Sequence, residues 1–237
     1  MQISIIIPTL NEEQALPETL RNIVNAIPGG EVIVVDGGSS DRTREVVREF
    51  AALHGESTAL CVVWLDAPVG RGSQMNAGAA RAMGDTLLFL HADSHLPTQT
   101  SDMIEAALRS PRVLGGFFRI AFIPRTSLTD FYAWCYNIRS HFRIFYGDAA
   151  LFVRRDVFER LGGYRAALLM EDIELILRLR RAGKLAYCRR AAVCTSSRRF
   201  PTTWMGIKML GVWFWLHFLM ACGVSQEKIA RLYPEKR

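Results

Sequence analysis

Four short apolar segments, separated by stretches of helical pattern, constrain the fold of this chain more than any other feature. The segments are ISIIIP, EVIVVD, ALCVVWL and TLLFL, and each is apolar throughout instead of alternating with polar residues. Strands of that kind occur in parallel sheets whose two faces are both covered by helices. We therefore predict a doubly wound, mostly parallel α/β sheet over roughly the first hundred residues.

Helical patterns fill the segments between these strands. Asp41 is well placed as the N-cap of the second helix. The opening MQISIIIPTL has no basic leader, so we expect a strand there and no signal peptide. After Pro97 the pattern is less regular and mixes strands with helices. The predicted helices span 13–26, 41–53, 72–83, 127–142 and 170–184, and the later strands span 114–122 and 185–197, with a strand running into a short helix in 145–164.

The composition agrees with one large folded domain. The chain has 237 residues, of which 50% are hydrophobic and 22% are charged, which is not the composition of a disordered chain. Its formal net charge of +6 suits anionic partners, namely nucleic acid, nucleotides, diphosphates or an acidic membrane surface. The 5 cysteines include no C-x-x-C pair and indicate reduced thiols in a reducing compartment.

Polar residues follow three of the predicted strands at the point where each ends. Ligands of open α/β sheets bind beyond the carboxyl ends of the strands, so these segments are candidate binding loops. Asp36 could accept a hydrogen bond from a base N–H or a ribose hydroxyl, or it could belong to an ordinary turn. No G-x-G-x-x-G follows the first strand and no G-x-x-x-x-G-K occurs, which excludes a Rossmann fingerprint and a P-loop. The polar segments are 8–12, 36–41 and 91–93.

Asp93 follows a buried strand and lies between two histidines. One carboxylate oxygen there can bind a hard divalent cation whose other ligands are waters and phosphate oxygens. His91 and His95 would suit zinc on a helix, but they precede Pro97 in a predicted turn, which favours a structural role for one of them. A wholly structural turn is the remaining alternative.

Charged residues in the second half offer further candidates. Glu171 and Asp172 open a predicted helix, where acids complement the helix dipole and where a carboxylate could also deprotonate an incoming hydroxyl. Between 175 and 200 the chain has many arginines and no acid, which indicates solvated faces or, alternatively, an RNA-binding surface. The tandem Arg198-Arg199 could clamp a diphosphate through paired hydrogen bonds.

The segment 204–224, WMGIKMLGVWFWLHFLMACGV, is apolar on most sides. Lys208 and His217 interrupt it, and it is short for a membrane span, so we do not expect it to cross a bilayer. Packing against a second subunit and peripheral contact with a membrane are both compatible with this pattern.

In this order and at this spacing, the segments resemble family 2 glycosyltransferases, the nucleotide-sugar-dependent enzymes with the GT-A fold. SIIIPTLNEE is similar to the family's opening strand and nucleotide loop, and EVIVVDGGSSDRT to its second strand, whose aspartate contacts the base. GRGSQMNAGAARAMGDTLLFLHADSHLP resembles the helix and strand that lead to the Asp-x-Asp motif. YGDAALFVRRDVFERLGGY and MEDIELILRLRRAG resemble the acceptor-side segment and the Glu-Asp motif of the base. LHADS, YGDAALFVRR and SSRRF are similar to a bacterial subgroup with a His-Ala-Asp variant of Asp-x-Asp.

The resemblance implies a role for each matching residue. Asp93 would bind a divalent cation, Mn2+ or Mg2+, and through it the diphosphate. Asp172 would be the general base, with Glu171 shaping its environment. His91 replaces the first acid of Asp-x-Asp, which leaves one fewer carboxylate near the cation. The other implied contacts are those of Pro8, Thr9, Asn11, Glu12, Asp36, Arg71, Asn76 and Ala92 with the nucleotide, and of Gly147 and Asp148 with the acceptor.

The resemblance implies an inverting glycosyltransferase that moves a hexosyl group from a nucleotide-diphosphate sugar to a hydroxyl of a saccharide, lipid or small molecule. We expect a GT-A domain over 1–200, divided into a nucleotide-binding half (1–97) and an acceptor-side half (98–200), and an apolar helical extension over 201–237. We expect a cytoplasmic location, with membrane contact or homodimerisation through 204–224.

Two other functions compete with this expectation. A sugar nucleotidyltransferase would need a glycine-rich, arginine-containing loop after the first strand, where this chain has PTLNEE. A non-catalytic basic module for RNA or acidic membranes would show salt-sensitive binding with no nucleotide preference.

Overall fold

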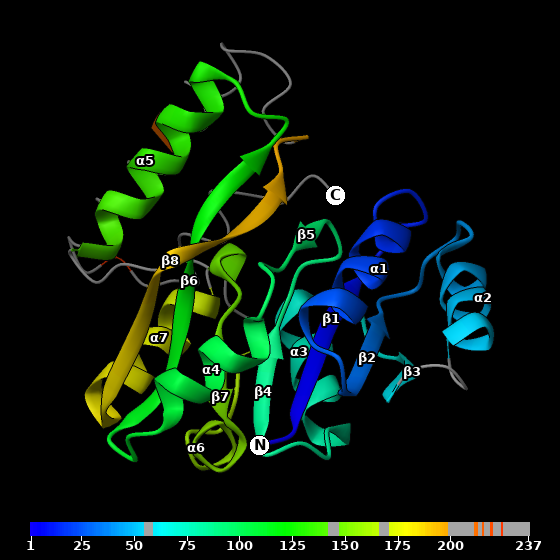
Figure 1. Cartoon of the computed structure of the whole chain (residues 1–237), viewed down its shortest axis with the longest axis horizontal. Coiled ribbons are helices and arrows are strands. Elements are labelled where there is room, and N and C mark those ends of the chain that lie inside the picture. Colours follow the sequence, from blue (N-terminus) through cyan, green and yellow to red (C-terminus); the bar gives the residue numbers. More distant parts are fainter. Residues whose placement is uncertain are drawn as a thin grey trace.

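A mixed β-sheet forms the centre of the molecule (Figure 1). The computed structural model describes residues 1–54, 59–141, 147–165 and 171–198, and the single positions 211, 212, 215, 219 and 224. Within these residues the sheet has eight strands in the order β3-β2-β1-β4-β7-β6-β8-β5. The strands are β1 (Ile3–Thr9), β2 (Gly30–Asp36), β3 (Leu60–Asp66), β4 (Thr86–Phe89), β5 (Ser94–His95), β6 (Val113–Ile123), β7 (Phe152–Arg154) and β8 (Lys184–Ser196).

The first four strands form the parallel sheet that the sequence predicts. β1 pairs in parallel with both β2 and β4, and β2 pairs in parallel with β3. In the second half, β7 is antiparallel to its neighbours β4 and β6, whereas β6 and β8 are parallel. The long β6–β8 pair extends past the rest of the sheet (Figure 1). The change of direction at β7 joins the two halves in one continuous sheet.

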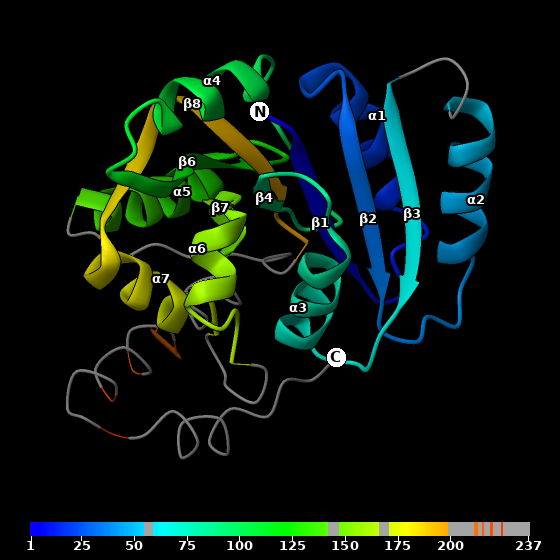
Figure 2. The ribbon, with the colours of Figure 1, turned by 90° about the horizontal axis from the view of Figure 1, so that it is seen from below.

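Helices cover both faces of the sheet, as predicted. α1, α2 and α4 share one apolar core with one face, and α3, α5, α6 and α7 share a second core with the other face. Figure 2 shows α2 and α3 on opposite sides of β2. The helices are α1 (Leu16–Ala26), α2 (Thr43–His54), α3 (Arg71–Arg81), α4 (Thr100–Leu108), α5 (Ser127–His141), α6 (Arg155–Arg160) and α7 (Glu171–Ala182), with a 3-10 turn η1 (Gly147–Ala149).

The alternating directions of strand side chains divide the two cores. In β1, Ile5 and Ile7 point into the first core and Ile6 points into the second, and all three are fully buried. Gly78 lets α3 approach β1 closely, because a Cβ atom there would lie 2.5 Å from Cγ2 of Ile6. This close packing places the start of α3 beside the carboxyl end of the sheet.

The start of the first helix and the segment after Asp93 differ from the sequence prediction. The first helix begins at Leu16 instead of residue 13. Asn11 adopts a positive φ of 55°, and the main-chain amides of residues 12 and 13 bind the side chains of Thr43, at the start of α2, and of Asp41, in the loop before it. Ser94 and His95, predicted to lie in a turn, form the short strand β5 against the end of β8. β5 therefore holds the segment that carries Asp93 against the carboxyl-terminal end of β8.

The apolar segment 204–224 and the proposed extension 201–237 fall almost entirely outside the described residues. No helix among the residues described is both long enough and apolar enough to cross a membrane. The four described cysteines, Cys61, Cys135, Cys188 and Cys194, carry free thiols.

Candidate active site

The carboxyl ends of β1 and β2 lie side by side, with Thr9 in register with Asp36. Gln74 of α3 holds the two ends together, since its Nε2 donates to the carbonyls of Thr9 and Val35 at 2.8 Å each. Its side chain is buried beneath the loops. Gln74 is not among the residues predicted from the sequence, although a polar residue on the inner side of a predicted helix, next to glycine-rich loops, is a usable signal.

The carboxylate of Asp36 organises the turn that follows β2. Its Oδ2 accepts hydrogen bonds from the amides of Gly38 (2.8 Å) and Ser39 (2.7 Å). Its Oδ1 accepts from the hydroxyls of Ser39 (2.5 Å) and Thr9 (3.3 Å). Gly38 has a φ of 99°, which glycine adopts without strain. Asp36 is only 4% exposed. It therefore stabilises the turn after β2, which is the structural role that the sequence allowed as an alternative to ligand binding.

Reciprocal hydrogen bonds join the loop after β1 to the loop after β2. The amide of Asn11 donates to Oγ of Ser39, and the amide of Ser40 donates to Oδ1 of Asn11, both at 2.8 Å. Asp41 accepts from the amide of Thr43 at 3.0 Å, in the first turn of α2. Although partial burial opposes it, hydrogen bonds from Thr43 and Glu13 lower the pKa of Asp41. Two of the predicted binding loops therefore form one preorganised wall.

Glu12 and Asp93, predicted to contact nucleotide and metal, converge on a single guanidinium. Arg198 donates to Oε2 and Oε1 of Glu12 at 2.8 and 2.5 Å, and its Nε lies 3.1 Å from Oδ2 of Asp93. The hydrogen bond with Glu12, opposed by burial and assisted by the charge of Asp93, raises the pKa of Arg198. Arg199, the other half of the predicted diphosphate clamp, lies outside the described residues.

The two histidines beside Asp93 have different partners. Nδ1 of His91 lies 3.0 Å from Oδ1 of Asp148 in η1, whereas Nε2 of His95 lies 3.9 Å from Oε1 of Glu18 in α1. Within the described ranges, no three His, Cys, Asp or Glu side chains gather closely enough to hold a metal ion by themselves. A divalent cation at Asp93 would need phosphate oxygens and waters as its other ligands.

Ala92 lies between these histidines with its side chain buried. Its carbonyl accepts a hydrogen bond from Oγ1 of Thr19 at 2.7 Å, which fixes the segment against α1. Pro8 belongs to β1, where it pairs with Val35. Both residues hold the backbone of predicted binding loops in place.

A second group of acids opens α7. Oδ1 of Asp172 accepts a hydrogen bond from the amide of Ile173 at 2.8 Å, and Oε1 of Glu171 lies 4.0 Å from Nε of Arg71 at the start of α3. Arg71, predicted to lie near the nucleotide, thus pairs with the predicted catalytic segment. The starts of α3 and α7 meet here.

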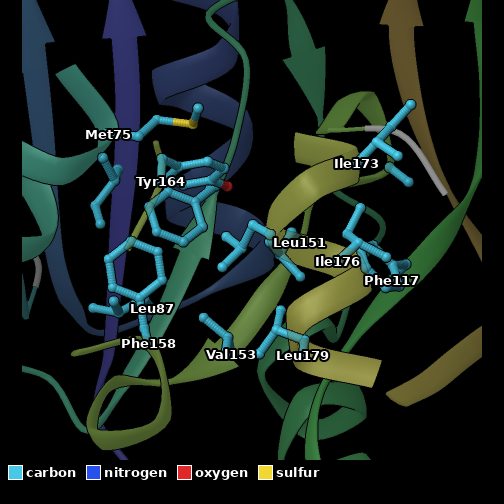
Figure 3. Close-up of a cluster of buried hydrophobic side chains, with 14 of the residues drawn as sticks. Met75, Leu87, Phe117, Leu151, Val153, Phe158, Tyr164, Ile173, Ile176 and Leu179 are labelled. Carbon is cyan, nitrogen blue, oxygen red and sulfur yellow. The ribbon is translucent and has the colours of Figure 1, made fainter. Parts of the chain in front are cut away.

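Tyr164 connects these acids to β4. Burial, followed by the charges of Asp172 and Glu171, raises the pKa of Tyr164 well above its ordinary value. Its ring packs edge-on against Phe89, with centroids 5.0 Å apart. Figure 3 shows the ring of Tyr164 above that of Phe158, with its oxygen on the side of α7. Sequence reasoning gave Tyr164 no role.

Asn76, another predicted nucleotide contact, fixes the backbone of Tyr164. Its Nδ2 donates to the Tyr164 carbonyl at 2.7 Å, and its Oδ1 accepts from the Tyr164 amide at 2.8 Å. Both ends of the amide are therefore engaged within the protein. The structure places Asn76 as a link between α3 and the segment that precedes the acids of α7.

The sequence of this chain is similar to those of known glycosyltransferases. The family model described as glycosyl transferase family 2 matches residues 4–162. The probable glycosyltransferase YdaM of Bacillus subtilis is 30% identical over 198 residues, which cover 77% of this chain and 47% of that protein. The undecaprenyl-phosphate 4-deoxy-4-formamido-L-arabinose transferase of Aeromonas hydrophila is 34% identical over 118 residues, covering 48% of this chain and 36% of that protein. The chain thus spans about half or less of the length of these curated relatives.

Solved structures share the fold at low sequence identity. A mannosyltransferase from Pyrobaculum calidifontis, in complex with GDP-Man and Mn2+, has a TM-score of 0.67 and 24% identity, covering 84% of this chain and 58% of that one. TarS from S. aureus, residues 1–349 in complex with UDP-GlcNAc, has a TM-score of 0.66 and 18% identity, covering 86% of this chain and 60% of that one. The predicted GT-A fold is confirmed.

Proposed function

The chain belongs to glycosyl transferase family 2, and we propose that it transfers a sugar from a nucleoside-diphosphate sugar to an acceptor hydroxyl with inversion of the anomeric centre. One observation carries the proposal: Glu12, Asp93 and Arg198, from three distant segments, meet at the carboxyl edge of the sheet. The guanidinium suits the negatively charged diphosphate of such a donor, and the carboxylates suit a divalent cation bound to that diphosphate.

The two joined loops would hold the nucleoside. Thr9 and Asp36 form the inner part of this wall, and Asn11 and Ser39 form its outer part. The wall exists before any ligand binds, so little conformational entropy is lost on binding. Nucleotide-sugar complexes of the structural relatives, with GDP-Man and UDP-GlcNAc, support this use of the edge.

A divalent cation, Mn2+ or Mg2+, is proposed to bind at Asp93. When bound, it would neutralise charge that develops on the departing nucleoside diphosphate. Arg198 and the Arg199 that follows it would contact the same diphosphate through paired hydrogen bonds. The structural relatives crystallised with Mn2+ support a cation at such a site.

Asp172 is proposed to deprotonate the acceptor hydroxyl. Glu171 and the buried Tyr164 surround it with a carboxylate and a neutral phenol, and Arg71 balances the added negative charge. Asp148 in η1, paired with His91, and the adjacent Gly147 would border the acceptor. The acceptor oxygen would then attack the anomeric carbon on the face opposite the departing diphosphate, which inverts the configuration of that carbon.

We also propose where the protein acts in the cell. The relative from Aeromonas hydrophila has the lipid undecaprenyl phosphate in its name, which supports a reaction at a membrane surface. We propose a cytoplasmic protein that contacts the membrane, or a second subunit, through the apolar segment 204–224.

Release of nucleoside diphosphate from a panel of UDP- and GDP-sugars, with Mn2+ or Mg2+, tests the proposal. We expect release with at least one donor, and a loss of about 100-fold or more in Asp93→Asn and in Asp172→Asn. Asp102→Asn, which changes an exposed aspartate in the first turn of α4, is the matched control and should retain full activity.

Full activity of Asp93→Asn or Asp172→Asn would refute the assigned roles. Calorimetric titration with UDP and GDP separates the alternatives. A non-catalytic basic module would show salt-sensitive binding of RNA or acidic vesicles without a preference for either nucleotide. A sugar nucleotidyltransferase would release pyrophosphate from a nucleoside triphosphate and a sugar phosphate.

A further inference from the structure

Among the residues that the structure describes, Arg198 joins the loop after β1 to the segment after β4 through ion pairs with Glu12 and Asp93. Its guanidinium contacts both oxygens of Glu12 and one oxygen of Asp93. The Arg198 side chain is 46% exposed, whereas those of Glu12 and Asp93 are 15% and 11% exposed. The two acids are therefore largely shielded from water, and a half-exposed arginine neutralises part of their charge.

The backbone around Arg198 is anchored beside Asp93. The amide of Ser196 donates to the carbonyl of Asp93 at 3.1 Å, and the amide of Ser197 donates to the carbonyl of Ile123 at 2.8 Å. Ser94 of β5 pairs with Thr195 of β8. The fold thus keeps the guanidinium within reach of Asp93, while the long side chain can change its partners without a change in the sheet.

A divalent cation and the guanidinium compete for the carboxylate of Asp93. The Oδ2 atom of Asp93 lies 3.1 Å from Nε of Arg198, so a cation bound to that oxygen would face a positive charge at short range. A diphosphate offers the guanidinium an alternative anionic partner with matching paired oxygens. A bound diphosphate would therefore favour the release of Asp93 by Arg198.

We propose that Arg198 is an exchangeable counter-cation: it holds Asp93 in the free protein and moves to the donor diphosphate when nucleotide and divalent cation bind. Cation and nucleotide then bind cooperatively, and Asp93 has low affinity for the cation alone. This inference rests on the proposed function, because it takes a nucleoside diphosphate as the ligand. Arg198 would therefore weaken the binding of the cation alone and strengthen the binding of the nucleotide.

Calorimetric titrations of Arg198→Ala with Mn2+ alone, and with UDP and GDP alone, test this inference. Loss of the competing charge should tighten the binding of Mn2+ by about tenfold. Loss of the paired hydrogen bonds should weaken the binding of the preferred nucleotide by about tenfold. Nucleotide should also strengthen Mn2+ binding by a smaller factor than in the wild type, because the arginine that couples the two ligands is absent. Mn2+ should strengthen nucleotide binding by the same reduced factor, since such coupling is reciprocal.

Two further variants complete the test. Arg190→Ala removes an exposed arginine of the same strand and should change neither affinity. Arg198→Lys keeps the charge but loses the fork, and should lie between the wild type and Arg198→Ala in both titrations, which also covers a failure of the alanine variant to fold.

Two outcomes overturn the inference in distinguishable ways. Unchanged or weaker Mn2+ binding by folded Arg198 variants, with nucleotide still bound by the wild type, would refute the exchange and leave the proposed function intact. Failure of the wild type to bind either nucleotide, with and without Mn2+, would refute the proposed function and the inference together.

Discussion

Two sets of polar contacts at the same edge of the sheet are built in different ways. The loops after β1 and β2 are joined by hydrogen bonds between side chains and main-chain amides, and the buried Asp36 organises the second of these loops. The segments that carry Glu12, Asp93 and Arg198 are joined by ion pairs between side chains. A buried acceptor that loses its hydrogen-bond donors cannot bind water in their place. A partly exposed ion pair, in contrast, can exchange one partner for a ligand or for water. The comparison indicates a fixed frame for the nucleoside beside charged contacts that change on binding.

Asp36→Asn should have the largest effect on stability. An asparagine amide can present only one acceptor oxygen, so at least one of the amides or hydroxyls that face Asp36 loses its partner. We expect the free energy of unfolding to fall by about 3 kcal/mol, as for a buried group that accepts hydrogen bonds as an ion. Chemical denaturation followed by circular dichroism measures this change.

Asp66→Asn is the matched control for that variant. Asp66 ends β3 in register with Asp36, but it is exposed and accepts a hydrogen bond from Nε1 of Trp64. We expect a loss below about 1 kcal/mol for a contact of this kind in water. Equal losses for the two variants would contradict the view that the loop after β2 is a buried frame.

Asn76→Ala should have the next largest effect. It removes two hydrogen bonds to the backbone of Tyr164, and we expect a loss of about 2 kcal/mol. Because Tyr164 adjoins the acids of α7, the variant should also reduce kcat and alter its pH profile. Denaturation and steady-state kinetics measure the two effects.

Asn137→Ala provides the comparison for Asn76→Ala. Asn137 of α5 makes an equivalent pair of hydrogen bonds to the amide and carbonyl of Ile120, at 3.0 and 2.9 Å. We expect a similar loss of stability with an unchanged pH profile. If both variants change the pH profile of kcat equally, general destabilisation explains the change. Asn76 would then have no specific influence on the acids of α7.

Glu12→Gln should change stability less than either of these variants. Its bidentate contact with Arg198 is partly exposed, and Arg198 can keep Asp93 as a partner, so we expect a loss below about 1 kcal/mol. The neighbouring Glu13→Gln, which alters a contact with the amide of Arg42, serves as the control. A loss as large as that of Asp36→Asn, measured by denaturation, would remove the distinction between the fixed and the exchangeable contacts.

The sequence predicted the fold because local patterns encode it, and the same patterns place candidate residues at the ends of strands. Apolar runs identified β1, β2 and β4, and the polar residues at their ends identified Thr9, Asp36 and Asp93. The short β5 escaped prediction because its pairing with β8 involves residues about a hundred positions apart, as Ser94 and Thr195 are. No local pattern reports such a pairing.

The partners of the candidate residues could not be predicted for the same reason. Arg198 was assigned to a ligand, but in the protein it bonds to Glu12 across 186 positions of sequence. Asn76 was assigned to the nucleotide, and its amide is engaged by Tyr164. Residue type and spacing indicate which side chains carry chemistry, whereas their contacts depend on how distant elements pack.

The smallest predicted effect concerns pH, at the junction of the two loops. The pKa of Asp41 lies below its ordinary value of 3.8, despite partial burial, because Thr43 and Glu13 donate hydrogen bonds to the carboxylate. The unfolded chain therefore binds a proton more readily than the folded one, so Asp41 stabilises the fold above its unfolded pKa and loses that contribution as the pH falls through the folded pKa.

Denaturation of the wild type and of Asp41→Asn at several pH values tests this dependence. The variant should be less stable at pH 7, and the difference should shrink steadily below about pH 4 as the wild-type carboxylate is protonated. Asp102→Asn, which changes an exposed aspartate of α4, should show no such pH-dependent difference. A difference for Asp41→Asn that stays constant down to the acid transition would mean that the ionised carboxylate does not hold the two loops together. The hydrogen-bonded wall would then depend on Asp36 and Asn11 alone, and the frame would be smaller than the contacts around Asp41 indicate.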